Sequence, residues 1–236
     1  MKQKNSLNER IRALQAALRD PEEGVRQKAA ESLSRIEART DLGAYARMLD
    51  SDDRAVRIQA IHLLAELATG GAIELLQLQV DGPYDDVRAA VIRALGSNFD
   101  NYKTRETREK AVDIALMGLK DASASVRVSA ADVLAKFGDP RSEEALLTVV
   151  TSGVDDGGEG SQLIVSALLA FGEIGSSEAV PVIIEKAMSD NLEIKKAALK
   201  VLGMIGDSRA EDCLIEALAD TDAGIRMQAA ESLGKL

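Results

Sequence analysis

The sequence predicts an all-α protein built as one stack of about seven helix pairs. Two observations carry this prediction: a short apolar segment recurs along the 236-residue chain, and every copy has the periodicity of one helical face. The composition agrees, because 46% of the residues are hydrophobic but only 3% are aromatic. A core of Ala, Leu, Val and Ile suits thin layers of closely approaching helices, whereas globular cores of this size usually bury more rings.

The repeat is defined by seven matching segments, each of which starts at an apolar anchor residue. The residues four and eight positions after the anchor are also apolar, as in Val126, Ala130 and Leu134, and this spacing places all three on one face of a helix. Successive anchors are separated by 31, 31, 39, 37, 31 and 31 residues, so two insertions fall in the middle of the array. The anchors are Val25, Val56, Val87, Val126, Leu163, Ile194 and Ile225.

A second apolar pattern precedes each anchor, so each repeat is expected to hold two helices with a short polar turn between them. Before Val126, for example, this pattern is Val112, Ala115 and Leu119. Stacked pairs of this kind bury one continuous core, and each pair touches only its neighbours. The chain is therefore expected to be a single solenoid over residues 1–236, with repeats at about 6–37, 38–69, 70–98, 99–138, 139–175, 176–206 and 207–236.

Two segments, Asp121 to Gly138 and Asp220 to Gly234, follow the pattern Asp-x-x-x-x-Val-Arg-x-x-Ala-Ala-x-x-Leu-Gly-x-Ile-Gly closely. This pattern resembles HEAT repeats of the phycobilisome-lyase-like subtype, which are armadillo-like α-solenoids. The resemblance extends over about residues 6–236. It implies a right-handed α-α superhelix in which the second helix of each pair lines the concave side. Repeat five departs from the pattern, because Ile164 stands where the basic residue belongs.

Charge and composition exclude several classes of function. The formal net charge of −10 argues against a nucleic-acid partner, because such proteins use Lys and Arg to displace the counterions of the phosphates. The single cysteine, Cys213, excludes an intramolecular disulfide framework. No apolar run of about 18 residues could span a membrane, and the N-terminal residues MKQKNSLNER lack the apolar stretch of a signal peptide. The expected location is therefore the cytoplasm, without a membrane partner.

A basic residue directly follows six of the seven anchors. We interpret these residues as a structural ladder of ion pairs and helix-end contacts, because such regular placement within repeats is what stacking requires. The alternative is a track that binds a polyanion. The residues are Arg26, Arg57, Arg88, Arg127, Lys195 and Arg226.

Helical phase predicts the residues of the concave face. If the anchor is buried, the second, third and sixth residues after it should face outward. In the middle of the array several of these positions are apolar, whereas the ends of the array are charged. An apolar stripe with a charged rim predicts a groove for a protein or peptide, although neighbouring helices could instead cover these side chains. The apolar positions are Ile58, Ala89, Ala90, Val128, Val165 and Leu169.

The predicted function is therefore a non-catalytic scaffold or adaptor that binds a protein or peptide on its concave face. An alternative from the resemblance is a HEAT-like subunit of a bilin lyase, or another accessory subunit of an enzyme. A further possibility is self-association through the C-terminal repeat, since the sequence stops inside its last helical pattern. The predicted contact residues are Ile58, His62, Arg93, Val128, Asp132, Val165 and Leu169.

No catalytic residue, cofactor or metal site is predicted. His62 is the single histidine, and with Glu66 it leaves a metal ion short of ligands. The insertion from Thr151 to Ser161 is acidic, but its spacing is not that of a calcium-binding EF-hand loop, so we expect a flexible loop. The other insertion, from Ser97 to Arg108, is expected to lengthen the first helix of repeat four.

Overall fold

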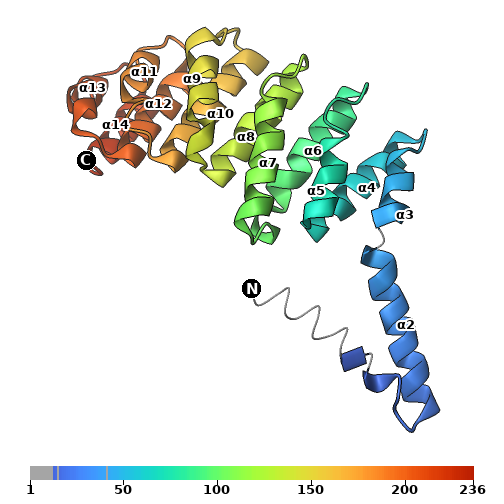
Figure 1. The fold of residues 1–236 in the computed structure, drawn as a ribbon. Helices are drawn as coiled ribbons and strands as arrows, with labels where there is room; N and C mark the ends of the chain where they lie inside the picture. The colour runs from blue at the N-terminus through green and yellow to red at the C-terminus, as the bar shows by residue number, and fades with distance from the viewer. Residues whose placement is uncertain (1–12, 15, 41) are drawn as a thin grey trace.

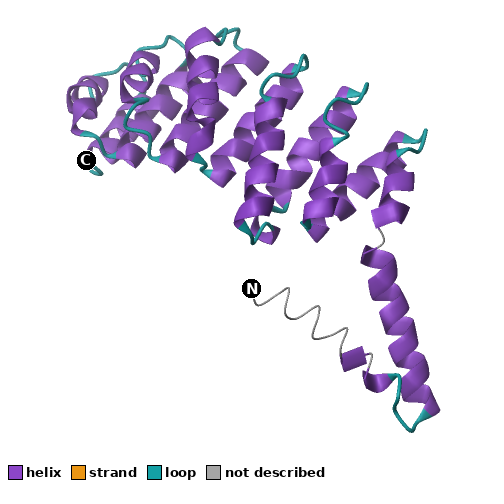
Figure 2. Ribbon diagram, viewed as in Figure 1, coloured by secondary structure: helices purple, strands orange, loops and turns teal. Residues whose placement is uncertain are grey.

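The structure is a computed structural model that describes residues 13, 14, 16–40 and 42–236. Every regular element within these residues is a helix, which confirms the predicted all-α class (Figures 1 and 2). The same residues contain no helix long and apolar enough to cross a membrane. The α-helices are α2 (Glu23–Thr40), α3 (Leu42–Leu49), α4 (Arg54–Leu67), α5 (Gly70–Gln77), α6 (Asp85–Ser97), α7 (Arg105–Gly118), α8 (Ala124–Phe137), α9 (Glu143–Ser152), α10 (Glu159–Ile174), α11 (Val180–Lys186), α12 (Leu192–Ile205), α13 (Glu211–Ala217) and α14 (Ala223–Leu233).

Helices α3 to α14 alternate between two layers of a curved stack (Figure 1). Each even-numbered helix packs extensively against the next even-numbered helix, from α4 through α14, whereas successive odd-numbered helices touch only sparsely. The layer in which neighbours approach most closely must lie on the inside of a curved stack. The even-numbered helices from α4 to α14, which contain six of the seven anchors, therefore form the concave side.

Glycine makes the close approach of the even-numbered helices possible. A Cβ atom added to Gly203 of α12 would lie 2.6 Å from the Cα atom of Ser232 in α14. A Cβ atom added to Gly96 of α6 would lie 2.7 Å from Cγ2 of Val133 in α8. Both glycines stand nine residues after an anchor, so the small residue belongs to the repeat itself.

The buried core is one continuous cluster that runs from Tyr45 to Ile225. Each helix pair adds fully buried aliphatic side chains to it, such as Leu64 of α4, Leu134 of α8 and Leu202 of α12. These three residues are the eighth after their anchors, as the helical periodicity predicted. The core therefore grows by one layer with each pair, which is how a solenoid differs from a globular domain.

Polar residues end and begin the helices where the turns require them. The side chain of Asp222 accepts a hydrogen bond from the backbone N–H of Ile225 at 3.0 Å, which caps the start of α14. Gly138 and Gly206 follow α8 and α12 with φ angles of 55° and 70°, the left-handed conformation that ends a helix. Three short 3-10 helices lie between α-helices: η1 (Phe99–Asn101), η2 (Pro140–Ser142) and η3 (Ser208–Ala210).

The N-terminal helix α2 extends away from the stack that α3 to α14 form (Figure 1). The predicted first repeat, 6–37, begins in residues 1–12, which lie outside the described residues. The packing of this first repeat therefore stays a prediction. The same holds for the repeat boundaries and for the total of seven repeats.

The two insertions differ in structure. In the first, η1 and a short turn lead to Thr104, whose side chain caps α7. Helix α7 has 14 residues, against 8 in α5, so part of the insertion does lengthen the first helix of its pair. In the second, the carboxylate of Asp156 accepts hydrogen bonds from the backbone N–H groups of Gly158 and Gly160 at 2.8 and 3.1 Å. The carboxylate of Asp156 thus accepts hydrogen bonds from backbone N–H groups of its own loop and of the start of α10.

Candidate partner-binding surface

The seven predicted contact residues all lie on even-numbered helices. Ile58 and His62 are on α4, Arg93 is on α6, Val128 and Asp132 are on α8, and Val165 and Leu169 are on α10. The concave layer thus holds the whole set, but the individual side chains differ in exposure.

His62, Arg93 and Asp132 are exposed to solvent. All three stand six residues after an anchor, so this position faces outward as helical phase predicted. Within the described part of the chain, the His62 and Arg93 side chains have no hydrogen-bond or ion-pair partner. The carboxylate of Asp132 accepts a hydrogen bond from the hydroxyl of Ser166 on α10, at 2.5 Å. Two of the three polar groups are therefore available to an external partner without breaking an internal contact.

The expected apolar stripe does not lie open on the surface. Val128 is only 7% exposed, and Ala89 and Ala90 are buried as well, so the prediction that these residues face outward is wrong. The reason is the close packing of α8 against both α6 and α10, which covers the side chains between the helices. Ile58 and Val165 are half-buried against the core. The alternative interpretation, in which neighbouring helices cover these positions, is the one the structure supports.

Leu169 is the apolar member of the exposed row. It occupies the sixth position after its anchor on α10 and is half-buried against the core. On the helices that follow, the same position holds the exposed residues Lys200 and Glu231. We call these sixth-position residues, from His62 to Glu231, the concave row. In this row, charged side chains of both signs lie on either side of the partly exposed Leu169. Whether any of these residues contacts a partner stays a prediction.

The basic residues after the anchors form the structural ladder that the sequence indicated. The guanidinium of Arg88 donates hydrogen bonds to both carboxylate oxygens of Asp121, in the next turn of the array, at 2.7 and 2.8 Å. This contact holds the pKa of Asp121 below its ordinary value. Arg127 and Arg226 instead donate to backbone carbonyl groups five and six residues earlier, at 2.7 to 2.8 Å. These cations are bound within their own turns, which does not support a polyanion track.

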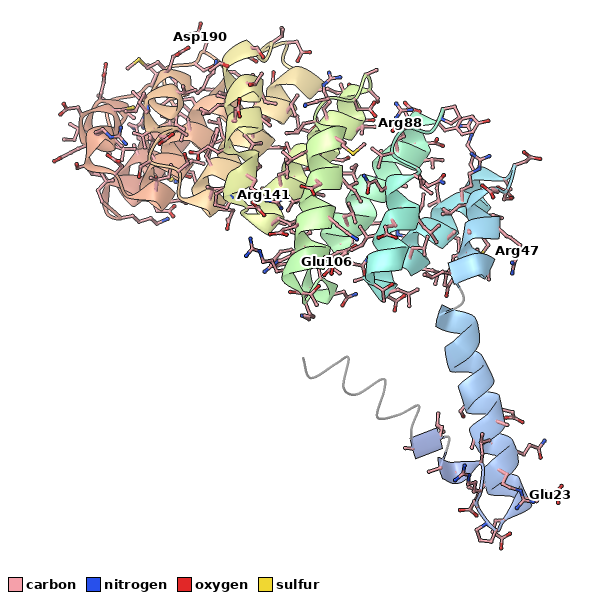
Figure 3. The ribbon with its side chains drawn as sticks, in the orientation of Figure 1. Glu23, Arg47, Arg88, Glu106, Arg141 and Asp190 are labelled. Carbon is pink, nitrogen blue, oxygen red and sulfur yellow. The ribbon has the colours of Figure 1, made fainter. Side chains whose placement is uncertain are left out.

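The two edges of the stack carry different groups. Figure 3 shows Arg88 and Asp190 along one edge, where the turns within helix pairs lie, and Glu106 and Arg141 along the opposite edge. In the described residues, no group of three or more His, Cys, Asp and Glu side chains is arranged to hold a metal ion. Two acidic residues in the turns of the first edge pair with cations of the ladder: Asp121 with Arg88 at 2.7 Å and Asp220 with Lys195 at 3.0 Å.

The architecture and the repeat pattern together define an α-solenoid. A sequence profile described as HEAT repeats matches residues 11–96, 74–157 and 162–235. The chain therefore belongs to the HEAT-repeat family, and the resemblance drawn from its sequence is confirmed. No sequence among the curated proteins matches it.

Solved structures of other repeat proteins have the same fold. The complex of CpcE and CpcF of phycocyanin lyase from Nostoc sp. PCC7120 contains a chain with 23% identity and a TM-score of 0.58, and the match covers 80% of this chain and 74% of that one. A designed armadillo repeat protein in complex with the peptide (KR)4 has 18% identity and a TM-score of 0.59, and the match covers 83% and 99% of the two chains. At these identities the likeness shows the fold and not a shared activity.

Proposed function

We propose that this protein is a non-catalytic scaffold or adaptor that binds a protein or peptide partner on its concave face. The observation that carries the proposal is the row of exposed side chains on the inner layer, in which His62 and Arg93 have no side-chain partner within the described residues. A row of polar groups on a rigid curved surface can match the charges of an extended or helical partner.

The repeat architecture supports this proposal because a solenoid offers an extended inner surface along its whole length. Two structurally similar proteins are complexes: one pairs CpcE with CpcF, and one holds the peptide (KR)4. In this chain Asp132 and Glu231 supply negative charge and Arg93 and Lys200 supply positive charge. We therefore expect a partner segment with charges of both signs.

The proposal is tested by capturing partners on the immobilised protein from the lysate of its source. Arg93→Glu reverses a charge in the inner row at an exposed position, so it should preserve folding. It should reduce recovery of a specific partner at least about tenfold, because like charges across an interface cost several kcal/mol. His62→Glu gives a second inner-row variant.

Lys120→Glu is the matched control, because Lys120 is an exposed cation that follows α7 of the outer layer and lies outside the inner row. We expect this variant to recover the partner as well as the unmodified protein does. Equal recovery by the Arg93, His62 and Lys120 variants would contradict binding on the concave face.

A further inference from the structure

The turn between α8 and α9 lies beside a surface pocket of about 420 Å³, which we call the arginine pocket. It combines the first turns of α7 with the turn that links α8 to η2. It therefore lies on the edge of the stack, apart from the concave row. Its lining residues are Arg105, Arg108, Glu109, Phe137, Gly138, Asp139, Pro140 and Arg141.

The insertion before α7 builds an aromatic support beneath this pocket. Phe99 of η1 meets Phe137 edge to face, with 5.1 Å between the ring centroids. Tyr102 is only 2% exposed and packs beside Phe137, with 6.0 Å between the ring centroids. The guanidinium of Arg108 lies over the ring of Phe99, 4.6 Å from its centroid. Ring contacts thus fix the direction of the Arg108 side chain while its charge remains at the exposed edge.

One of the three arginines has a structural role that recurs elsewhere in the array. Arg141 forms an ion pair with Asp139 at 3.0 Å and also reaches Asp113 on α7 at 2.9 Å. Arg209 contacts Asp207 in the same way after α12, at 2.7 Å. Because the Asp–x–Arg contact occurs at both turns, it explains Arg141 without a ligand.

The other two arginines of the pocket, Arg105 and Arg108, differ in their internal contacts. Both stand in the first turn of α7, where the helix dipole favours acidic side chains over basic ones. The first turns of α7, α9 and α13 each also hold an acidic residue, namely Glu106, Glu143 and Glu211. Arg105 pairs with Glu109 at 2.6 Å, but Arg108 has no carboxylate partner among the residues that the structure describes.

Three guanidinium groups and two carboxylates, those of Glu109 and Asp139, therefore line one pocket in a chain of net charge −10. The two carboxylates pair with Arg105 and Arg141, which leaves the charge of Arg108. The pocket has the guanidinium of Arg108, the ring of Phe137 and a volume of about 420 Å³. Together these suit a charged side chain with some of its flanking backbone. Guanidinium groups bind phosphate and carboxylate groups through paired, charge-assisted hydrogen bonds.

We propose that the arginine pocket binds an anionic side chain, a phosphate monoester or a carboxylate, carried on a segment of a partner protein. Arg108, which rests on the Phe99 ring, supplies a charge that has no carboxylate within ion-pair distance among the described residues. The ion-paired Arg105 and Arg141 lie beside it. This site lies outside the concave row and is a second contact point, so its test does not depend on partner binding there.

The test uses three pools of fluorescent nine-residue peptides that share randomised uncharged flanks and differ only at the central residue. The central residue is phosphoserine, glutamate or serine. Binding to the full chain is followed by fluorescence anisotropy at low ionic strength. We expect the phosphoserine pool, the glutamate pool or both to bind at least about tenfold more tightly than the serine pool. Competition by inorganic phosphate against the phosphoserine pool alone would identify phosphate as the preferred group, and preference for the glutamate pool would identify carboxylate.

Arg108→Gln should remove about tenfold of that preference, because one charge-assisted contact is lost. Arg105→Gln is a second variant, at an exposed position where the fold is not at risk. Arg54→Gln is the matched control: Arg54 also lies over an aromatic ring, 4.0 Å from that of Tyr84, but it sits on the opposite edge and pairs with Asp86. The proposal is overturned if neither anionic pool binds more tightly than the serine pool, or if Arg108→Gln and Arg54→Gln bind alike.

Discussion

The contact between Arg88 and Asp121 links two successive repeats through nearly buried side chains. The side chains are 14% and 8% exposed, in contrast to the surface pair of Arg54 and Asp86, which are 53% and 45% exposed. Ion pairs in water contribute little because solvent screens them, whereas hydrogen-bonded charges away from water contribute more. The ladder therefore acts at selected turns and not uniformly along the edge.

We predict that Asp121→Asn lowers the free energy of unfolding by about 1.5 to 3 kcal/mol at neutral pH, because charge-assisted hydrogen bonds from Arg88 are lost. Since the folded-state pKa of Asp121 is lowered, its contribution is present above the unfolded pKa, about 4. The contribution is lost as pH falls through the lower folded pKa. Urea unfolding at several pH values measures the difference, which should shrink in acid.

The control for this prediction is Asp86→Asn, which removes the exposed pair and should change stability by less than about 1 kcal/mol. Equal losses in the two variants at neutral pH would contradict the role assigned to the contact between Arg88 and Asp121.

Val128 marks the limit of helical phase as a guide to exposure. Phase correctly placed His62, Arg93 and Asp132 on the surface, because the sixth position after the anchor lies on the exposed side of the inner helices. The second position points toward the space between adjacent inner helices. Whether that space is filled depends on the distance between the helices, and the periodicity of a single helix gives no information about that distance.

We predict that Val128→Asp lowers the free energy of unfolding by about 3 kcal/mol, because it places a charge in a covered position. His62→Asp, at an exposed position of the same layer, should change stability far less. Chemical denaturation of both variants measures the contrast. Unfolding of Val128→Asp at the same denaturant concentration as the unmodified protein would show that the position is open to solvent.

At the scale of the helix, the spacing between inner helices depends on small residues. Gly203 of α12 leaves room for the backbone of α14, and Gly96 does the same for Val133 of α8. The repeat pattern in the sequence contains a glycine directly after leucine, and the structure shows that Gly96 and Gly203 at this place face the next inner helix. The insertion before α7 was harder to predict, because the contact of Phe99 with Phe137 joins two segments far apart in the sequence.

We predict that Gly203→Ala lowers the free energy of unfolding by about 1 to 3 kcal/mol, because the new methyl group would overlap the backbone at Ser232. Gly24→Ala in α2 is the control. Nothing lies within 4 Å of a Cβ atom there, so alanine should be neutral or stabilise by up to about 1 kcal/mol. Thermal or urea unfolding measures the effect of both variants. An unchanged free energy of unfolding for Gly203→Ala would contradict the close approach of α12 and α14.

At the scale of the whole molecule, the repeat spacing was sufficient to predict an all-α solenoid. The four- and eight-residue periodicity identified Leu64, Leu134 and Leu202 as core residues. The resemblance to HEAT repeats implied which helix of each pair lines the concave side. The polarity of the inner surface was not predictable in this way. It depends on which side chains adjacent helices cover, and covering Val128 and Ala89 leaves a charged row where the sequence indicated an apolar groove.

The most direct test of the account is covalent footprinting of lysines in the complex with a captured partner. Lys196 and Lys200 lie exposed on the inner helix α12, and Lys120 lies exposed after the outer helix α7. Acylation of amines followed by mass spectrometry reports which of these groups the partner covers. The account predicts that Lys196 and Lys200 lose reactivity in the complex while Lys120 keeps it. Protection of Lys120 with full reactivity of Lys196 and Lys200 would contradict binding on the concave face.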